Sequence, residues 1–201
     1  MTDVPTPFRY PKDKHFRRLR PGPFARYQSY KPALRQEFEQ KCVYCRAPDG
    51  PKGLDGFGVD HYRPKSLFPT LRTTYTNLFY CCNQCNRRKG SHWPANPKAR
   101  IPNPCDHEMH KHLRFASERV EGRTSQGNEA LEVLDLNDPD AILMRKMVNG
   151  TLRGQQQLLG QIHVKITALE RLQVLGVAEA IEQLRASAAE IQEQMNWFLG
   201  R

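Results

Sequence analysis

Long apolar runs and acidic residues are both scarce in this sequence of 201 residues. No stretch approaches the roughly 18–20 apolar residues that a membrane-spanning helix requires. The opening residues, MTDVPTPFRYPKDK, lack the apolar centre of a secretory signal. These absences predict a soluble, cytoplasmic protein with no membrane partner.

The shortage of acidic residues leaves the chain strongly basic. Thirty-one Lys and Arg residues face 21 Asp and Glu residues, which gives a net charge of +10. Such an excess is typical of proteins that contact phosphate groups. More than half of it lies in residues 1–32, where six prolines prevent continuous helix and predict an extended basic arm. The aromatic residues of this arm can stack on bases or pin the arm to the core, and pinning is favoured.

Proline and glycine divide the rest of the chain into three parts. Residues 33–93 are expected to form the core, and the proline-broken residues 94–154 an irregular and partly helical extension. Residues 155–201 carry apolar residues at helical spacing, which predicts an antiparallel helical hairpin or one bent long helix. The expected fold class is α+β, mostly α.

Short elements are predicted within the core from composition and spacing. Helices are expected over residues 33–40 and from residue 83 to about 91, and strands over residues 57–62 and 74–80.

Four of the six cysteines form two C-x-x-C pairs, Cys42 with Cys45 and Cys82 with Cys85. Two such pairs can supply four thiolates to one tetrahedral Zn²⁺, and four sulfur ligands leave no open position for substrate. The sequence therefore predicts a structural zinc site rather than a catalytic one. Spacing leaves the third ligand open between Cys81 and Cys82, although C-x-x-C geometry favours Cys82.

The interval between the cysteine pairs, and the helix after it, carry residues that suit phosphodiester hydrolysis. His61 has an ordinary pKa near 6.5, which suits a general base at neutral pH. Asp60 and Asn86 offer the hard oxygen ligands that Mg²⁺ or Mn²⁺ prefers. Because neighbours on a regular strand point to opposite faces, Asp60 and His61 should lie where the strand ends. Pro64 directly after Arg63 supports such an ending.

Three motifs over residues 42–90 resemble the HNH (ββα-metal) endonuclease family: C-V-Y-C, V-D-H-Y-R-P-K-S and N-L-F-Y-C-C-N-Q-C-N-R-R-K-G. The resemblance implies a zinc-stapled ββα-metal core that cleaves DNA to leave 5′-phosphate and 3′-hydroxyl ends. It also implies that Asp60 is a metal ligand, that His61 is the base and that Asn77 braces the loop between the strands.

A looser resemblance extends downstream, through N-P-C-D-H-E-M-H-K-H-L-R-F and A-L-E-V-L-D-L-N. This pattern is similar to small bacterial HNH proteins of anti-phage defence, including the Septu type, where the nuclease works beside an ABC-like ATPase. It implies a defence role and an ATPase partner.

Basic residues around the motifs are expected to hold the substrate through its phosphates. They are Arg63, Lys65, Arg87, Arg88 and Lys89.

Histidines downstream of the motifs do not suggest a second metal site. His107 and His110 lie in H-E-M-H, which is not the H-E-x-x-H spacing of metalloproteases, and substrate contact or local capping is favoured instead.

Two other functions remain open at this point. A non-catalytic zinc-knuckle module that binds nucleic acid would explain the charge and the cysteines but not Asp60, His61 and Asn86. A nuclease subunit that is inactive alone would use the helices after residue 155 to dock on an ATPase or on a second copy of itself. RNA also stays open as a substrate beside DNA.

Overall fold

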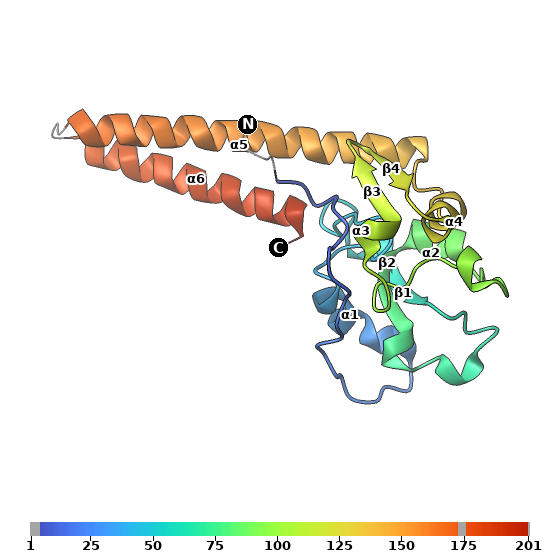
Figure 1. Cartoon of the computed structure of the whole chain (residues 1–201). Coiled ribbons are helices and arrows are strands. Elements are labelled where there is room, and N and C mark those ends of the chain that lie inside the picture. The colour runs from blue at the N-terminus through green and yellow to red at the C-terminus, as the bar shows by residue number, and fades with distance from the viewer. Residues whose placement is uncertain (1–4, 173–175, 201) are drawn as a thin grey trace.

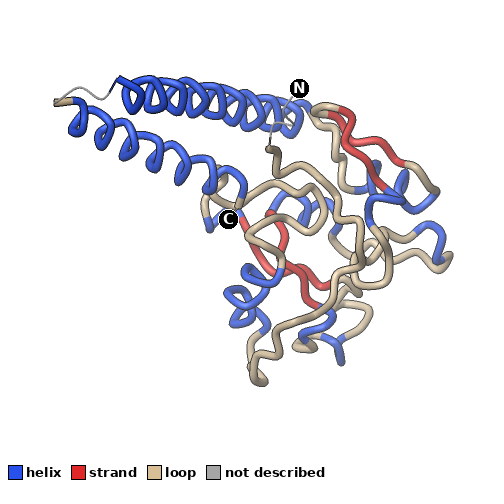
Figure 2. Tube along the Cα trace, turned by 60° about the vertical axis from the view of Figure 1, so that its left-hand side comes forward, coloured by secondary structure: helices blue, strands red, loops and turns tan. Residues whose placement is uncertain are grey.

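A computed structural model describes residues 5–172 and 176–200 (Figures 1 and 2). The helices are α1 (Lys31–Glu37), α2 (Asn83–Lys89), α3 (Met109–His112), α4 (Ser125–Val133), α5 (Pro139–Leu172) and α6 (Val177–Leu199). The strands are β1 (Phe57–His61), β2 (Leu78–Cys82), β3 (Leu113–Ala116) and β4 (Arg119–Gly122). Helix dominates and the sheets are small, which confirms an α+β fold that is mostly α. Residues 1–4 of the expected arm, and 173–175 and 201 of the expected C-terminal helices, lie outside the described residues.

The centre of the body is a hairpin followed at once by a short helix. β1 and β2 pair antiparallel, with Phe57 opposite Cys82 and His61 opposite Leu78. Helix α2 begins directly after β2 and ends at Gly90, whose φ of +48° favours glycine there. This is the predicted ββα arrangement, and it sets the ends of β1 and α2 beside each other.

The second strand begins later than its composition predicts. Residues 75–77 form a 3₁₀ turn, closed by the Asn77 N–H on the Thr74 carbonyl at 2.9 Å. The strand then continues through Cys81 and Cys82. The β-branched and aromatic residues of the turn gave it a strand-like composition, whereas the local turn hydrogen bond decides its conformation.

The N-terminal arm is pinned to the core. Phe8 and Tyr10 are buried, and the Tyr10 hydroxyl donates to the Tyr44 carbonyl at 2.9 Å. Arg17 donates to the Leu78 carbonyl at 2.6 Å and lies over the ring of Phe79. Three aromatic residues of the arm, Phe8, Tyr10 and Tyr30, are buried and therefore structural.

A second hairpin, β3–β4, packs beside α4 and was not predicted within residues 94–154. It is tied to the start of α5 by Arg145, whose side chain is fully buried. The guanidinium donates to the carbonyls of Glu118 and Leu136 and lies over the ring of Phe115. A buried Arg that is shared among backbone carbonyls fixes the hairpin against the helix.

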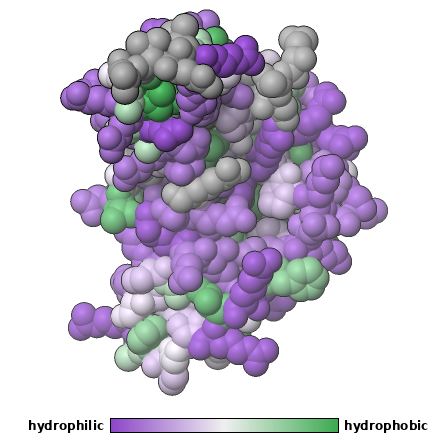
Figure 3. All heavy atoms as spheres, turned by 90° about the vertical axis from the view of Figure 1, so that its left-hand side faces the viewer, coloured by the Kyte–Doolittle hydropathy of each residue, from purple (hydrophilic) through white to green (hydrophobic). Residues whose placement is uncertain are grey.

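Helices α5 and α6 form an antiparallel hairpin that projects from the body (Figure 1). The first of them begins at Pro139, well before residue 155. Ile162 and Met195 are among the buried apolar residues of the pair. Seen from the end of the hairpin, the surface is mainly hydrophilic with scattered apolar residues (Figure 3). Among the described residues, no helix combines the length and apolar character needed to cross a membrane.

The base of the helical hairpin meets the body at Gly50. A Cβ atom at this position would lie 2.7 Å from Cε2 of Trp197, near the end of α6. The close approach of backbone and indole explains why the loop carries glycine there.

Candidate active site and metal centre

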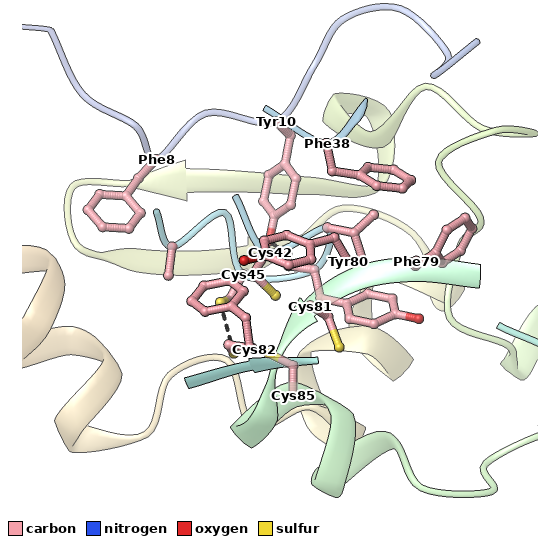
Figure 4. Close-up of a cluster of buried hydrophobic side chains, with 14 of the residues drawn as sticks. Phe8, Tyr10, Phe38, Cys42, Cys45, Phe79, Tyr80, Cys81, Cys82 and Cys85 are labelled. Carbon is pink, nitrogen blue, oxygen red and sulfur yellow. Dashed lines mark hydrogen bonds between the residues drawn. The ribbon is translucent and has the colours of Figure 1, made fainter. Parts of the chain in front are cut away.

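Four buried cysteines from two parts of the chain come together where the first hairpin meets α2 (Figure 4). Cys42 and Cys45 lie in the loop after α1, Cys82 ends β2, and Cys85 lies in α2. All four Sγ atoms lie within 4.8 Å of one another.

The geometry of the four thiols fits a tetrahedral zinc. Zn–S bonds of about 2.3 Å place the corners of a tetrahedron about 3.8 Å apart. The Sγ atoms of Cys45 and Cys82 are 3.8 Å apart, and no disulfide links any of the cysteines. Hydrogen bonds with the Cys42 thiol lower the pKa of Cys45 and of Cys82. Burial raises the pKa of Cys42, and hydrogen bonds with the other three thiols raise the pKa of Cys85. A bound metal ion would favour the thiolate form of all four.

Cys81 does not belong to this group. It precedes Cys82 on β2, so its side chain points to the opposite face of the hairpin. Burial raises the pKa of its thiol well above the usual value. The choice between Cys81 and Cys82 that spacing left open therefore falls on Cys82.

The Asp60 carboxylate is buried at the core of the candidate active site, with a side chain 3% exposed. Tyr44, between the first two cysteines, donates to its Oδ2 at 2.5 Å. The ammonium of Lys89 donates to its Oδ1 at 3.0 Å and to the His61 carbonyl at 2.7 Å. Each carboxylate oxygen accepts one hydrogen bond in these contacts and keeps a second lone pair for a metal ion.

His61 is the last residue of β1, as the strand-end argument predicts. Its Nε2 lies 2.8 Å from the Arg72 carbonyl oxygen, and Tyr27 packs edge-on against the ring at 4.6 Å. Because a carbonyl only accepts, Nε2 carries the proton and Nδ1 of the neutral ring keeps a lone pair. Burial lowers the pKa of His61 and outweighs the opposing effects of the Arg72 carbonyl and Asp60, so the ring is neutral at neutral pH.

Asn77 ties the chain that leaves β1 to the chain that enters β2. Its Oδ1 accepts from the Arg63 N–H at 2.9 Å, and its Nδ2 donates to the Arg63 carbonyl at 3.1 Å. Its own carbonyl accepts from the Tyr62 N–H at 2.9 Å. These are the contacts expected of a brace beside His61.

A pocket of ≈290 Å³ brings the candidate residues together. Its walls include Tyr27, Asp60, His61, Lys65, Asn86 and Ser91. Asn86 donates from Nδ2 to the Val59 carbonyl at 3.4 Å, and this contact does not use its Oδ1. Carboxylate and amide oxygens on the walls of one pocket are a donor set that suits Mg²⁺ or Mn²⁺.

The basic residues expected to hold substrate divide into two groups. Arg63, Lys65 and Arg87 are exposed. Arg88 is bound to Asp138 at 2.8 Å and to Asp135 at 3.1 Å, so in this structure it links α2 to the chain before α5 instead of facing solvent.

Lys89 also departs from the expected substrate contact, because its ammonium is buried against Asp60. Nothing in an R-R-K run distinguishes a buried lysine from an exposed one. The sequence likewise does not indicate that Tyr44 contacts Asp60, because Tyr44 occupies one of the two unspecified positions of C-x-x-C.

The downstream histidines form local contacts. His107 Nδ1 lies 3.0 Å from His112 Nε2, and His112 Nδ1 lies 2.7 Å from Thr124 Oγ1. Thr124 caps α4 by accepting from the Gly127 N–H. In the described part of the chain, the four cysteines are the one cluster of His, Cys, Asp and Glu with metal-binding geometry.

Replacing Lys89 by methionine should strongly destabilise the protein. The change leaves the Asp60 carboxylate buried with Tyr44 as its remaining partner, and we expect the free energy of unfolding to fall by about 3 kcal/mol. Urea unfolding followed by circular dichroism measures this. Arg87→Met, two residues earlier and exposed, is the matched control and should change stability by less than about 0.5 kcal/mol. Equal stability of the two variants would refute the buried ion pair.

A comparison with known protein families finds a match in this part of the chain. Residues 42–92 match the HNH endonuclease family. This HNH segment, residues 42–92, contains all four cysteines and the residues of the pocket around His61 except Tyr27. The resemblance expected from its motifs is therefore confirmed.

A relative extends the comparison beyond the HNH segment. Over 121 residues the chain is 32% identical to the Septu protein PtuB of Bacillus thuringiensis. The alignment covers 59% of this chain and 45% of that protein, so the chain spans less than half of the relative's length. No solved structure matches the chain.

Proposed function

We propose that this protein is a metal-dependent HNH endonuclease that hydrolyses DNA phosphodiester bonds in anti-phage defence. One observation carries the proposal: a single pocket is lined by an oriented neutral His61 together with the oxygen donors of Asp60 and Asn86, inside a segment that matches the HNH endonucleases. A non-catalytic zinc module has no use for this arrangement.

His61 is the proposed general base. Its Nε2–H is held by the Arg72 carbonyl, so Nδ1 is the atom that can take a proton from an attacking water. Asn77 supports the same geometry, because it fixes the backbone of Arg63 beside the end of β1. We assign Asn77 a positioning role in catalysis.

Asp60 and Asn86 are the proposed ligands of a divalent Mg²⁺ or Mn²⁺ ion. The ion would supply charge neutralisation at the scissile phosphate and at the leaving 3′-oxygen. Lys89 and Tyr44 each donate a hydrogen bond to the Asp60 carboxylate and so hold it in a fixed orientation, as a metal ligand requires. The four-cysteine centre would hold a structural Zn²⁺. The bound ion would in turn fix the positions of β2 and α2.

Substrate phosphates are proposed to meet Lys65 at the pocket and Arg63 and Arg87 beside it. Lys65 also lies over the ring of Tyr27 at 4.8 Å, which holds its charge near His61.

The likeness to the Septu protein PtuB supports the defence context. We also propose that the protein acts beside an ABC-like ATPase, because the looser resemblance of its sequence to Septu-type proteins implies such a partner.

A cleavage panel tests the proposed function. The purified protein is incubated with supercoiled plasmid, single-stranded DNA and RNA, each with Mg²⁺, Mn²⁺, Zn²⁺ or EDTA. We expect plasmid nicking with Mg²⁺ or Mn²⁺ and none with EDTA. If no arm shows cleavage, the panel is repeated with the ATPase partner and ATP added. Absence of cleavage in that repeat as well would overturn the nuclease assignment. Cleavage that appears only after the partner is added identifies a subunit that is inactive by itself.

A further inference from the structure

A larger cleft lies away from the HNH pocket, between the N-terminal arm, the β3–β4 hairpin and α5. Its volume is ≈510 Å³, and it shares no lining residue with the pocket around His61. The partly exposed Phe115 gives it an apolar wall, while the lining residues Phe8 and Leu113 are almost fully buried. Clefts of this volume accommodate small organic ligands.

The rim of this cleft is strongly basic. Its cationic lining residues are Arg9, Lys12, Arg114, Arg123 and Arg153, and Glu118 is its acidic one. These cations come from the arm, β3, the end of the second hairpin and α5, so the fold gathers charges that are far apart in sequence. Arg114 is paired with Glu121, whereas Lys12 and Arg153 are exposed at the cleft. A concentration of one charge sign around a cavity favours anions.

An unpartnered histidine nitrogen marks the same cleft. Nδ1 of His110 is buried and has no hydrogen-bond partner. The backbone of His110 is nevertheless held firmly. Its backbone N–H donates to the Pro11 carbonyl, and its backbone carbonyl accepts from the Arg123 side chain. A buried polar atom without a partner is costly, and a turn of the His110 side chain toward a ligand in the cleft would remove this cost.

We propose that this cleft binds a nucleotide. The apolar wall suits the base and ribose, while Lys12, Arg123 and Arg153 suit the phosphate groups. A bare phosphate would leave the apolar wall unused, and a purely apolar ligand would leave the cations unused. The nucleotide is either free or one unit of a nucleic-acid strand, and in the second form the proposal rests on the proposed nuclease function.

Binding measurements on a charge-reversed cleft test this proposal. The double variant Lys12→Glu/Arg153→Glu reverses two exposed rim charges without touching the HNH pocket. The matched control is Lys165→Glu/Arg171→Glu, which makes the same change in net charge at exposed positions of α5 outside the cleft. Both are titrated with ATP, and separately with single-stranded oligothymidylate, by calorimetry without added divalent metal. Circular dichroism melting confirms that both fold.

We expect the cleft variant to lose about tenfold or more in affinity for the probe that binds wild type, while the control changes by less than about twofold. Binding of ATP identifies a free nucleotide as the ligand, and binding of oligothymidylate alone identifies a strand. Absence of binding by both probes, or equal losses in both double variants, would overturn the proposal. The measurement needs no cleavage, so it is independent of the outcome of the nuclease panel.

Discussion

Replacing His61 by alanine should lower plasmid nicking by about 10³-fold while leaving a folded, zinc-loaded protein. The imidazole is the one group of the pocket with an oriented, unprotonated nitrogen, and a general base typically contributes about 10²–10⁴-fold. The variant removes the Arg72 contact but none of the four thiols. Initial rates of nicking in Mg²⁺ and Mn²⁺ measure the effect.

A matched control separates this effect from loss of a histidine in general. His163 is exposed on α5, and His163→Ala should cleave at the wild-type rate. Zinc content and thermal unfolding should be alike in both variants. Cleavage by His61→Ala at more than about a tenth of the wild-type rate would exclude His61 as the base.

Replacing Cys45 by serine should prevent stable folding. Structural zinc contributes an apparent free energy of about 10 kcal/mol that is coupled to folding, and Cys45 lies at 3.8 Å from Cys82 within the four-thiol group. We expect the variant to carry no stoichiometric zinc and to be largely unfolded or aggregated. Zinc analysis by colorimetric chelator, together with circular dichroism, measures both properties.

Cys105→Ser is the control for this experiment, because Cys105 lies outside the four-thiol group. It should retain one zinc per chain. A soluble Cys45→Ser protein with full activity would show that the thiol centre is not needed for the fold. The proposal of a structural zinc site would then be wrong.

The central ββα arrangement could be predicted because its signals are local. Two C-x-x-C pairs fix which residues meet, and the proline after Arg63 marks the end of the first strand. The position of His61 at that end, and the contacts of Asn77 with Arg63, agree with what the motifs imply. Whether these residues catalyse hydrolysis remains a prediction.

Other features depend on contacts between distant residues and were not predictable. The burial of Lys89 follows from Asp60, twenty-nine positions earlier, and the role of Arg88 follows from Asp138, fifty positions later. The β3–β4 hairpin has short strands whose alternation is weak, and it is held by Arg145 and by the two hydrogen bonds of Asn137 with Val120. Local amino-acid composition does not indicate contacts between residues that are far apart in the sequence.

The N-terminal arm and the end of α6 both pack onto the HNH segment, so we expect that residues 42–92 do not fold alone. The Tyr10 hydroxyl donates to the Tyr44 carbonyl, Arg17 donates to the Leu78 carbonyl, and Trp197 closes over Gly50. A fragment cut at the boundaries of the family match would expose these carbonyls and the apolar surface beneath the arm. We therefore expect the cooperative folding unit to extend past the boundaries of the family match, to the arm and to the end of α6.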